Sequence, residues 1–110
     1  MKVIVNGRTT ELIDTQGDFQ LFFEEVSNQY DSFLNQNLIL DITQDNSITI
    51  QSIKAFSELS KTHKNGKKSF VIVSNNIDFN AVPKSLVIVP SLLEAYDIIE
   101  MEEIERDLGF

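Results

Sequence analysis

Apolar and polar positions follow two different periodicities along this chain, and the two alternate. Short runs rich in apolar and β-branched residues predict strands at 2–5, 8–13, 38–42, 69–74 and 86–89. Between them, apolar residues recur at three- and four-residue spacing, most clearly from Phe19 to Leu34. The same spacing predicts helices over 47–64 and 92–107, and the stretch 75–82 has room for one helical turn.

Residues that begin helices and turns stand at the boundaries of these segments. Asp18 is a good N-cap for the first helix, and Ser91 with Glu94 forms a capping box for the last. The pair Asn6-Gly7 between the first two strands is a strong hairpin signal. It predicts a type I′ turn, which has a positive φ at both central positions.

The order of the predicted elements defines the fold class. Strands alternate with helices as β-β-α-β-α-β-α-β-α, and the last three strands are apolar throughout, as is typical of parallel strands covered on both faces. The sequence therefore predicts an α/β fold with a mixed, mostly parallel sheet and an N-terminal β-hairpin. No repeat, linker or low-complexity tract is present, so we expect residues 1–110 to form a single domain.

The chain is acidic, and its acidic residues are concentrated near the end. The net charge is −8, and residues 91–110 carry seven acidic residues against Arg106 alone, which gives −6 for this segment. Such a surface repels a phosphate backbone, so we expect no nucleic-acid partner. Four lysines clustered in 61–68 are interpreted as the solvated end of a helix, because no aromatic stacking residues or glycine-rich loop accompany them.

Cysteine is absent from the sequence, which excludes disulfides and thiolate chemistry and favours a reducing compartment. The N-terminus lacks the apolar stretch of a signal peptide. No segment reaches the ~20 apolar residues that a membrane helix needs. We therefore expect a cytoplasmic protein with no membrane partner.

Residues that carry catalysis are scarce. His63 is the only histidine, stands among lysines near a predicted helix end, and is expected to be exposed. A metal site would need further ligands converging on it, and a Ser-His-Asp triad would need a nucleophile elbow that the sequence lacks. The four glycines are scattered, so a nucleotide-binding loop cannot be built. The sequence predicts no catalytic residue, metal or cofactor.

Polar residues follow the first buried strand at the end where ligands bind in open parallel sheets. Asp41 closes this strand, and Thr43, Ser47 and Ser52 follow around the start of the next helix. These four residues are candidates for a phosphorylation site or a ligand-binding edge. The alternative is that Asp41 bonds the backbone of the following turn and that the hydroxyls cap the helix.

The segment 38–43, with the sequence LILDIT, resembles part of a STAS domain, the fold of bacterial anti-sigma-factor antagonists. In that family an apolar strand ends in an LDLS-like sequence and precedes a helix that starts with a D-S-S-G-like motif. The family's later strands correspond here to 70–73 and to 86–89, the second of which leads into Leu93-Glu94-Ala95. The resemblance implies a STAS-like fold and a non-catalytic regulator that binds a protein.

One departure from the family pattern affects regulation. In STAS domains of this kind the helix-start motif carries a serine whose phosphorylation switches binding to an anti-sigma kinase. Counting from Asp41, this serine falls on Ile50 or Gln51, which cannot be phosphorylated. Ser52 occupies the glycine position and Ser47 lies a few residues earlier, so the resemblance implies a domain that lacks the usual phosphoserine switch.

The segment 94–110 is also similar to the end of small STAS-like proteins that are sometimes labelled ribonuclease Z. That label implies a binuclear zinc hydrolase with an HxHxDH motif. A chain with one histidine cannot form this motif. We interpret the label as one transferred from a neighbouring gene or a partner, so an accessory role beside a ribonuclease Z-type enzyme is an alternative function.

The last helix carries two sets of apolar residues on different sides. One set is expected to pack on the sheet and comprises Leu92, Leu93, Ala95, Tyr96 and Ile99. The second set comprises Ile98, Met101, Ile104 and Leu108. Either the helix bends around the domain edge, or the second set forms a docking stripe together with Phe110, with 98–110 as a protruding tail.

Two classes of function remain open. The favoured class is a non-catalytic adaptor that binds a protein partner, or a second copy of itself, through the last helix or the loop after Asp41. The alternative is a small-ligand or enzymatic role at the C-terminal edge of the sheet, around Asp41, Ser74, Asn75 and Asn76.

Overall fold

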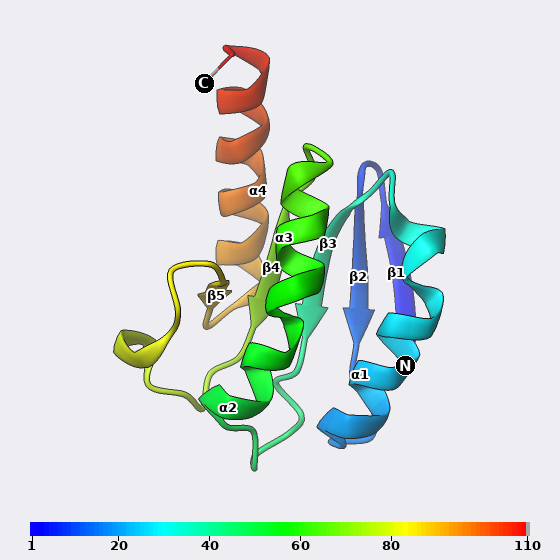
Figure 1. The fold of residues 1–110 in the computed structure, drawn as a ribbon, viewed down its shortest axis with the longest axis vertical. Coiled ribbons are helices and arrows are strands. Elements are labelled where there is room, and N and C mark those ends of the chain that lie inside the picture. Colours follow the sequence, from blue (N-terminus) through cyan, green and yellow to red (C-terminus); the bar gives the residue numbers. More distant parts are fainter. Residues whose placement is uncertain (110) are drawn as a thin grey trace.

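A five-stranded sheet lies between two unequal layers of helix in the computed structural model, which describes residues 1–109 (Figure 1). The strands are β1 (Lys2–Asn6), β2 (Thr9–Ile13), β3 (Asn37–Asp41), β4 (Phe70–Val73) and β5 (Val87–Val89). The helices are α1 (Phe19–Gln29), α2 (Ile50–Ile53), α3 (Ser57–Asn65) and α4 (Leu92–Asp107). Short 3-10 turns cover Tyr30–Phe33, Lys54–Phe56 and Phe79–Ala81.

The sheet has the predicted mixed topology. Its strand order is β1-β2-β3-β4-β5, in which β1 and β2 are antiparallel and every other pair is parallel. The α/β class, the mostly parallel sheet and the N-terminal hairpin are therefore confirmed. The helix predicted over 47–64 is present as α2, a 3-10 turn and α3 in succession.

The hairpin turn differs from the prediction by one position. Asn6 pairs with Thr9, so the central residues are Gly7 and Arg8, and only Gly7 has a positive φ, of 61°. This is the pattern of a type II′ turn, which requires positive φ at its first central position alone. The predicted type I′ turn is therefore wrong, although the hairpin itself is present.

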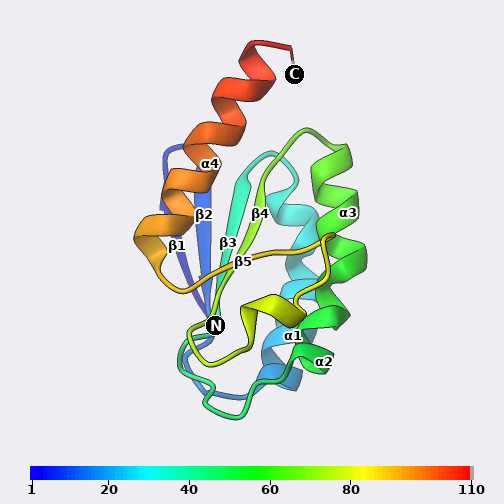
Figure 2. The same cartoon turned by 90° about the vertical axis from the view of Figure 1, so that its left-hand side faces the viewer.

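The two faces of the sheet carry separate apolar clusters. Leu12, Leu40 and Ile72 lie on the face covered by α1 and α3, where phenylalanine rings of α1 pack around Phe56 of the 3-10 turn before α3. Ile39 and Val71 point to the opposite face. That face is covered by α4 alone, as the view along the sheet in Figure 2 shows. The alternation follows from the two-residue period of a strand.

His63 is buried, so the prediction that it is exposed is wrong. Its side chain retains 2% exposure and lies between two partners, the Tyr30 hydroxyl at 2.8 Å from Nδ1 and the Gln36 carbonyl at 2.6 Å from Nε2. A backbone carbonyl only accepts hydrogen bonds, so Nε2 carries the proton and Nδ1 of the neutral ring accepts from Tyr30. Burial lowers the pKa of His63 and raises that of Tyr30.

The predicted helix caps are present. The Asp18 carboxylate accepts from the N–H of Leu21 at 3.1 Å at the start of α1. At the start of α4, the Ser91 hydroxyl accepts from the N–H of Glu94 at 3.2 Å and donates to the Glu94 carboxylate at 2.7 Å. These contacts satisfy N–H groups that a helix start leaves without internal partners.

Candidate functional site

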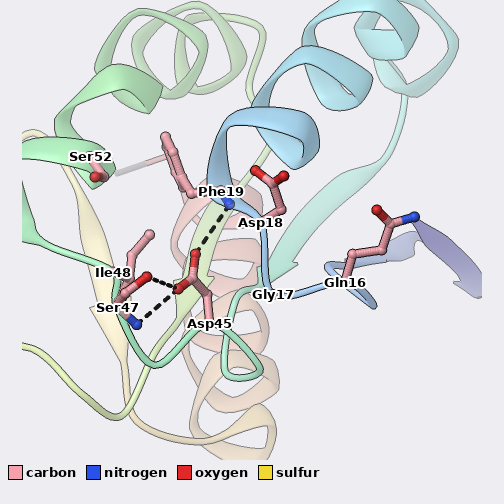
Figure 3. Close-up of a pocket in the computed structure, with 8 residues that line it drawn as sticks. All are labelled: Gln16, Gly17, Asp18, Phe19, Asp45, Ser47, Ile48 and Ser52. Atoms are coloured by element: carbon pink, nitrogen blue, oxygen red, sulfur yellow. Dashed lines mark hydrogen bonds between the residues drawn. The ribbon is translucent and has the colours of Figure 1, made fainter.

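A polar cleft of about 450 Å³ opens at the C-terminal edge of the sheet, between the start of α1 and the loop that leads to α2 (Figure 3). It is lined by Gln16, Gly17, Asp18, Phe19, Asp45, Ser47, Ile48 and Ser52. Two of the residues predicted for a phosphorylation site or ligand edge, Ser47 and Ser52, therefore lie in its wall. The other two, Asp41 and Thr43, do not line it.

The carboxylates of the cleft are engaged by the protein itself. The buried Asp45 accepts from the N–H and the hydroxyl of Ser47, at 2.9 and 2.8 Å, through one oxygen. Its other oxygen accepts from the N–H of Phe19 at 3.1 Å. Asp18 caps α1 in the same wall. An anion placed at Ser47 would face the Asp45 carboxylate, so the electrostatics at this serine oppose phosphate.

Asp41 and the hydroxyl groups near it form hydrogen bonds within a turn and at the start of α2. The Asp41 carboxylate accepts from the N–H and the hydroxyl of Thr43, at 3.0 and 2.7 Å. The N–H of Ser52 donates to the Thr49 hydroxyl at 3.1 Å, which caps α2. Asp41 thus bonds the turn that follows it, as the alternative interpretation has it, whereas the hydroxyl that caps α2 belongs to Thr49 and not to Ser47 or Ser52.

The remaining polar residues proposed for this edge are dispersed. Ser74 is buried and its N–H donates to the carbonyl of Val89 at 3.0 Å. Asn75 is exposed, and the Asn76 amide donates to the side chain of Asn46 at 3.1 Å. Within residues 1–109, no group of three or more His, Cys, Asp or Glu side chains is arranged to hold a metal ion.

The outward face of α4 is a second candidate surface. Leu92, predicted to pack on the sheet, is 37% exposed. Four other large apolar side chains of α4 point to solvent, with exposed fractions of 73% for Leu93, 59% for Met101, 52% for Ile104 and 64% for Leu108. At 100° per residue they fall within an arc of about 80°, centred opposite the buried pair Ala95 and Ile99. We call these four residues the outer stripe.

Acidic residues frame the outer stripe on both sides and within it. They are Glu94, Asp97, Glu100, Glu105 and Asp107, all exposed. Within the part of the chain that the structure describes, none of these carboxylates forms a salt bridge. The outer stripe therefore combines apolar side chains with unneutralised negative charge.

Two residues of α4 exchange the roles predicted for them. Ile98, predicted for the docking stripe, packs against the sheet cluster around Ile39 and Val71. Leu93, predicted to pack on the sheet, is the most exposed member of the outer stripe. Ala95 and Ile99 define the side of α4 that faces the sheet. Leu93 lies about 140° around the helix from the middle of that side. Phe110, the fifth predicted stripe residue, lies outside the described residues.

Polar contacts fix α4 on the sheet. The Tyr96 hydroxyl donates to the buried Glu11 carboxylate at 2.5 Å, and burial together with this bond raises the pKa of Tyr96. Arg106 reaches the side chains of Asn37 and Ser69, at 3.4 and 3.3 Å, where β3 and β4 begin. The one basic residue of 91–110 thus faces the sheet, and the outer stripe keeps its acidic frame.

No protein-family model matches this chain, and no curated protein sequence matches it significantly. Among residues 1–109, no helix has the length and apolar character needed to cross a membrane.

Proposed function

We propose that this protein is a non-catalytic binding module whose outer stripe docks a basic, amphipathic segment of a partner protein. The exposure of Leu93, Met101, Ile104 and Leu108 on one face of α4 carries this proposal. Helix faces of this spacing are used in helix-in-groove recognition, and methionine adapts well to such interfaces. The same helix is fixed to the sheet by its opposite side, so docking requires no rearrangement of the fold.

The charge around the outer stripe determines which partner fits. Two copies of α4 facing one another would bring five carboxylates from each chain together, which disfavours self-association through this face. A partner with lysine or arginine beside its apolar residues would neutralise those carboxylates while burying the outer stripe. We therefore commit to a basic amphipathic partner.

We also propose that the protein is a cytoplasmic regulator, in agreement with the STAS-like resemblance. We propose that this regulator lacks the usual phosphoserine switch. In support, the Ser47 hydroxyl donates to Asp45, whose carboxylate would repel a phosphate there. The small-ligand alternative at the same cleft is not proposed further, because Asp45 and Asp18 already accept hydrogen bonds from the protein.

The proposal is tested with a synthetic helical peptide of about five turns, carrying leucine along one face and lysine elsewhere. We expect it to bind the unmodified protein. Combining Met101→Ser with Ile104→Ser should weaken binding about 100-fold, because two buried apolar side chains are lost. Fluorescence anisotropy measures the affinity, and circular dichroism verifies that each variant is folded.

A matched control distinguishes binding at the outer stripe from nonspecific binding of the peptide to any exposed apolar side chain. Leu34 is 48% exposed, similar to Ile104, but lies outside α4, just after the 3-10 turn Tyr30–Phe33. Leu34→Ser should bind the peptide as the unmodified protein does. The same peptide with glutamate in place of lysine should not bind. Equal binding by the double variant and the Leu34 control would overturn the proposal.

A further inference from the structure

The outer edge of β1 presents backbone groups without partners. The register pairs Asn6 with Thr9 across a two-residue turn, which makes them a hydrogen-bonded pair. The carbonyl of Arg8 and the N–H of Asp14 bond toward β3, which confirms that Thr9 and the residues alternating with it in β2 bond toward β1. In β1, therefore, Lys2, Ile4 and Asn6 bond to β2, while Val3 and Val5 direct their N–H and C=O groups outward.

This edge has few of the features that usually prevent strand pairing. It contains no proline and no acidic residue, and its one charged side chain is Lys2 at the end. The side chains of Val3 and Val5 are 42% and 67% exposed. Within residues 1–109, no hydrogen bond reaches the outward groups of these two valines.

We propose that β1 pairs antiparallel with β1 of a second copy, in a register centred on Ile4, to form a continuous ten-stranded sheet. In this register Val3 of each copy lies opposite Val5 of the other, and all four outward groups of each β1 find partners. Lys2 lies opposite Asn6, so no like charges meet. The edge is thus complementary to itself in both hydrogen bonding and charge.

A dimer of this kind would be weak and would leave the outer stripe free. Few side chains are buried at one strand edge, so the interface is smaller than about 1,200 Å² and a dissociation constant in the range of about 10–1,000 μM is expected. In Figure 1, β1 lies at one edge of the sheet and α4 lies toward the other. The inference goes beyond the proposed function and is independent of it.

Cysteine cross-linking tests this register, because the natural chain has no cysteine. In a pair centred on Ile4, the two Ile4 residues form a non-hydrogen-bonded pair with Cα atoms about 4.5 Å apart, within the range that a disulfide spans. Ile4→Cys should therefore form a covalent dimer under mild oxidation. Lys2→Cys, on the same face of β1, should not, because the two Lys2 residues would lie about 13 Å apart.

Removal of an outward N–H provides the second variant. Val5→Pro deletes an outward donor while leaving the bonds to β2 in place, and proline is tolerated on edge strands in this position. Sedimentation at increasing concentration should show dimers for the unmodified protein and fewer dimers for Val5→Pro. The inference is overturned if the unmodified protein remains a monomer at about 1 mM. Equal cross-linking of the two cysteine variants would overturn it as well.

Discussion

On one side of the sheet, fourteen residues from the strands, α1, α2, the 3-10 turns and the loops form a single buried apolar cluster, whereas on the other side α4 and the strands bury five. The larger cluster contains the stacked and edge-on phenylalanine rings and the Tyr30–His63 pair. The smaller one is formed by the aliphatic residues Ile39, Val71, Val73, Ala95 and Ile99. Because α4 packs through so narrow a contact, most of its circumference remains at the surface.

This difference indicates that one face of the sheet provides most of the stability and the other carries the proposed binding surface. Burial of apolar surface dominates the stability of a small domain, so the face with the larger cluster contributes most of it. The face with α4 contributes less and carries exposed apolar and acidic residues that folding does not use. The following predictions test whether stability and binding are divided in this way.

The largest decrease in stability is expected from a substitution within the larger cluster. Phe56 is fully buried, and its ring contacts those of Phe19, Phe22, Phe23 and Phe70. Phe56→Ala should lower the free energy of unfolding by about 3–5 kcal/mol, because it removes a buried ring and leaves a cavity. Urea unfolding measures this. A loss below about 1 kcal/mol would show that this cluster does not dominate stability.

A smaller decrease in stability is expected when the hydroxyl group that bonds the buried histidine is removed. Tyr30→Phe keeps the ring but leaves Nδ1 of His63 without a donor. The free energy of unfolding should fall by about 1–3 kcal/mol, the cost of an unsatisfied buried polar group. Urea unfolding compares the variant with the unmodified protein, and an unchanged midpoint would contradict the hydrogen bond.

The protonation of His63 should make the free energy of unfolding depend on pH, with a still smaller effect. Its pKa in the folded protein is lowered from the ordinary 6.5, mainly by burial and also by the charge of Lys68. As the pH falls below 6.5, the unfolded chain therefore takes up a proton first, and stability decreases until the lowered pKa is reached. The decrease amounts to at most about 1.4 kcal/mol per pH unit.

The His63 contribution is isolated by comparing pH dependences. Unfolding of the unmodified protein and of His63→Gln is measured at pH 7.0 and at pH 5.5. The unmodified protein should lose more stability between these two values, because glutamine does not titrate. The carboxylates titrate in both proteins and cancel in the difference. Identical losses in the two proteins would contradict a lowered pKa for His63.

Elements whose signals are local were predictable from the sequence. The Asp18 cap and the Ser91–Glu94 pair depend on residues three positions apart, and the buried strands are visible as short apolar runs. His63 was predicted wrongly because Lys61 and Lys64, its lysine neighbours on α3, lie on other sides of the helix. Its spacing from Phe56 and Ser60, which are both buried, places all three on one helix face, and this signal was available.

The candidate surface was predictable in part. Met101, Ile104 and Leu108 stood out because their spacing makes a second apolar side on α4. The assignments of Leu93 and Ile98 failed because the sequence does not fix the rotation of a helix that is apolar on two sides. That rotation is set by the fit of Ala95 and Ile99 against β3 and β4, which are contacts between distant parts of the chain.

The two isoleucines on opposite sides of α4 provide the most direct test of the account. Ile99 is 2% exposed and Ile104 is 52% exposed, so the same substitution can be made on each face of one helix. Urea unfolding of Ile99→Ala should show a loss of about 2–5 kcal/mol. Ile104→Ala should remain within about 0.5 kcal/mol of the unmodified protein. Similar losses for the two variants would mean that the outer stripe is part of the core, and would contradict the account.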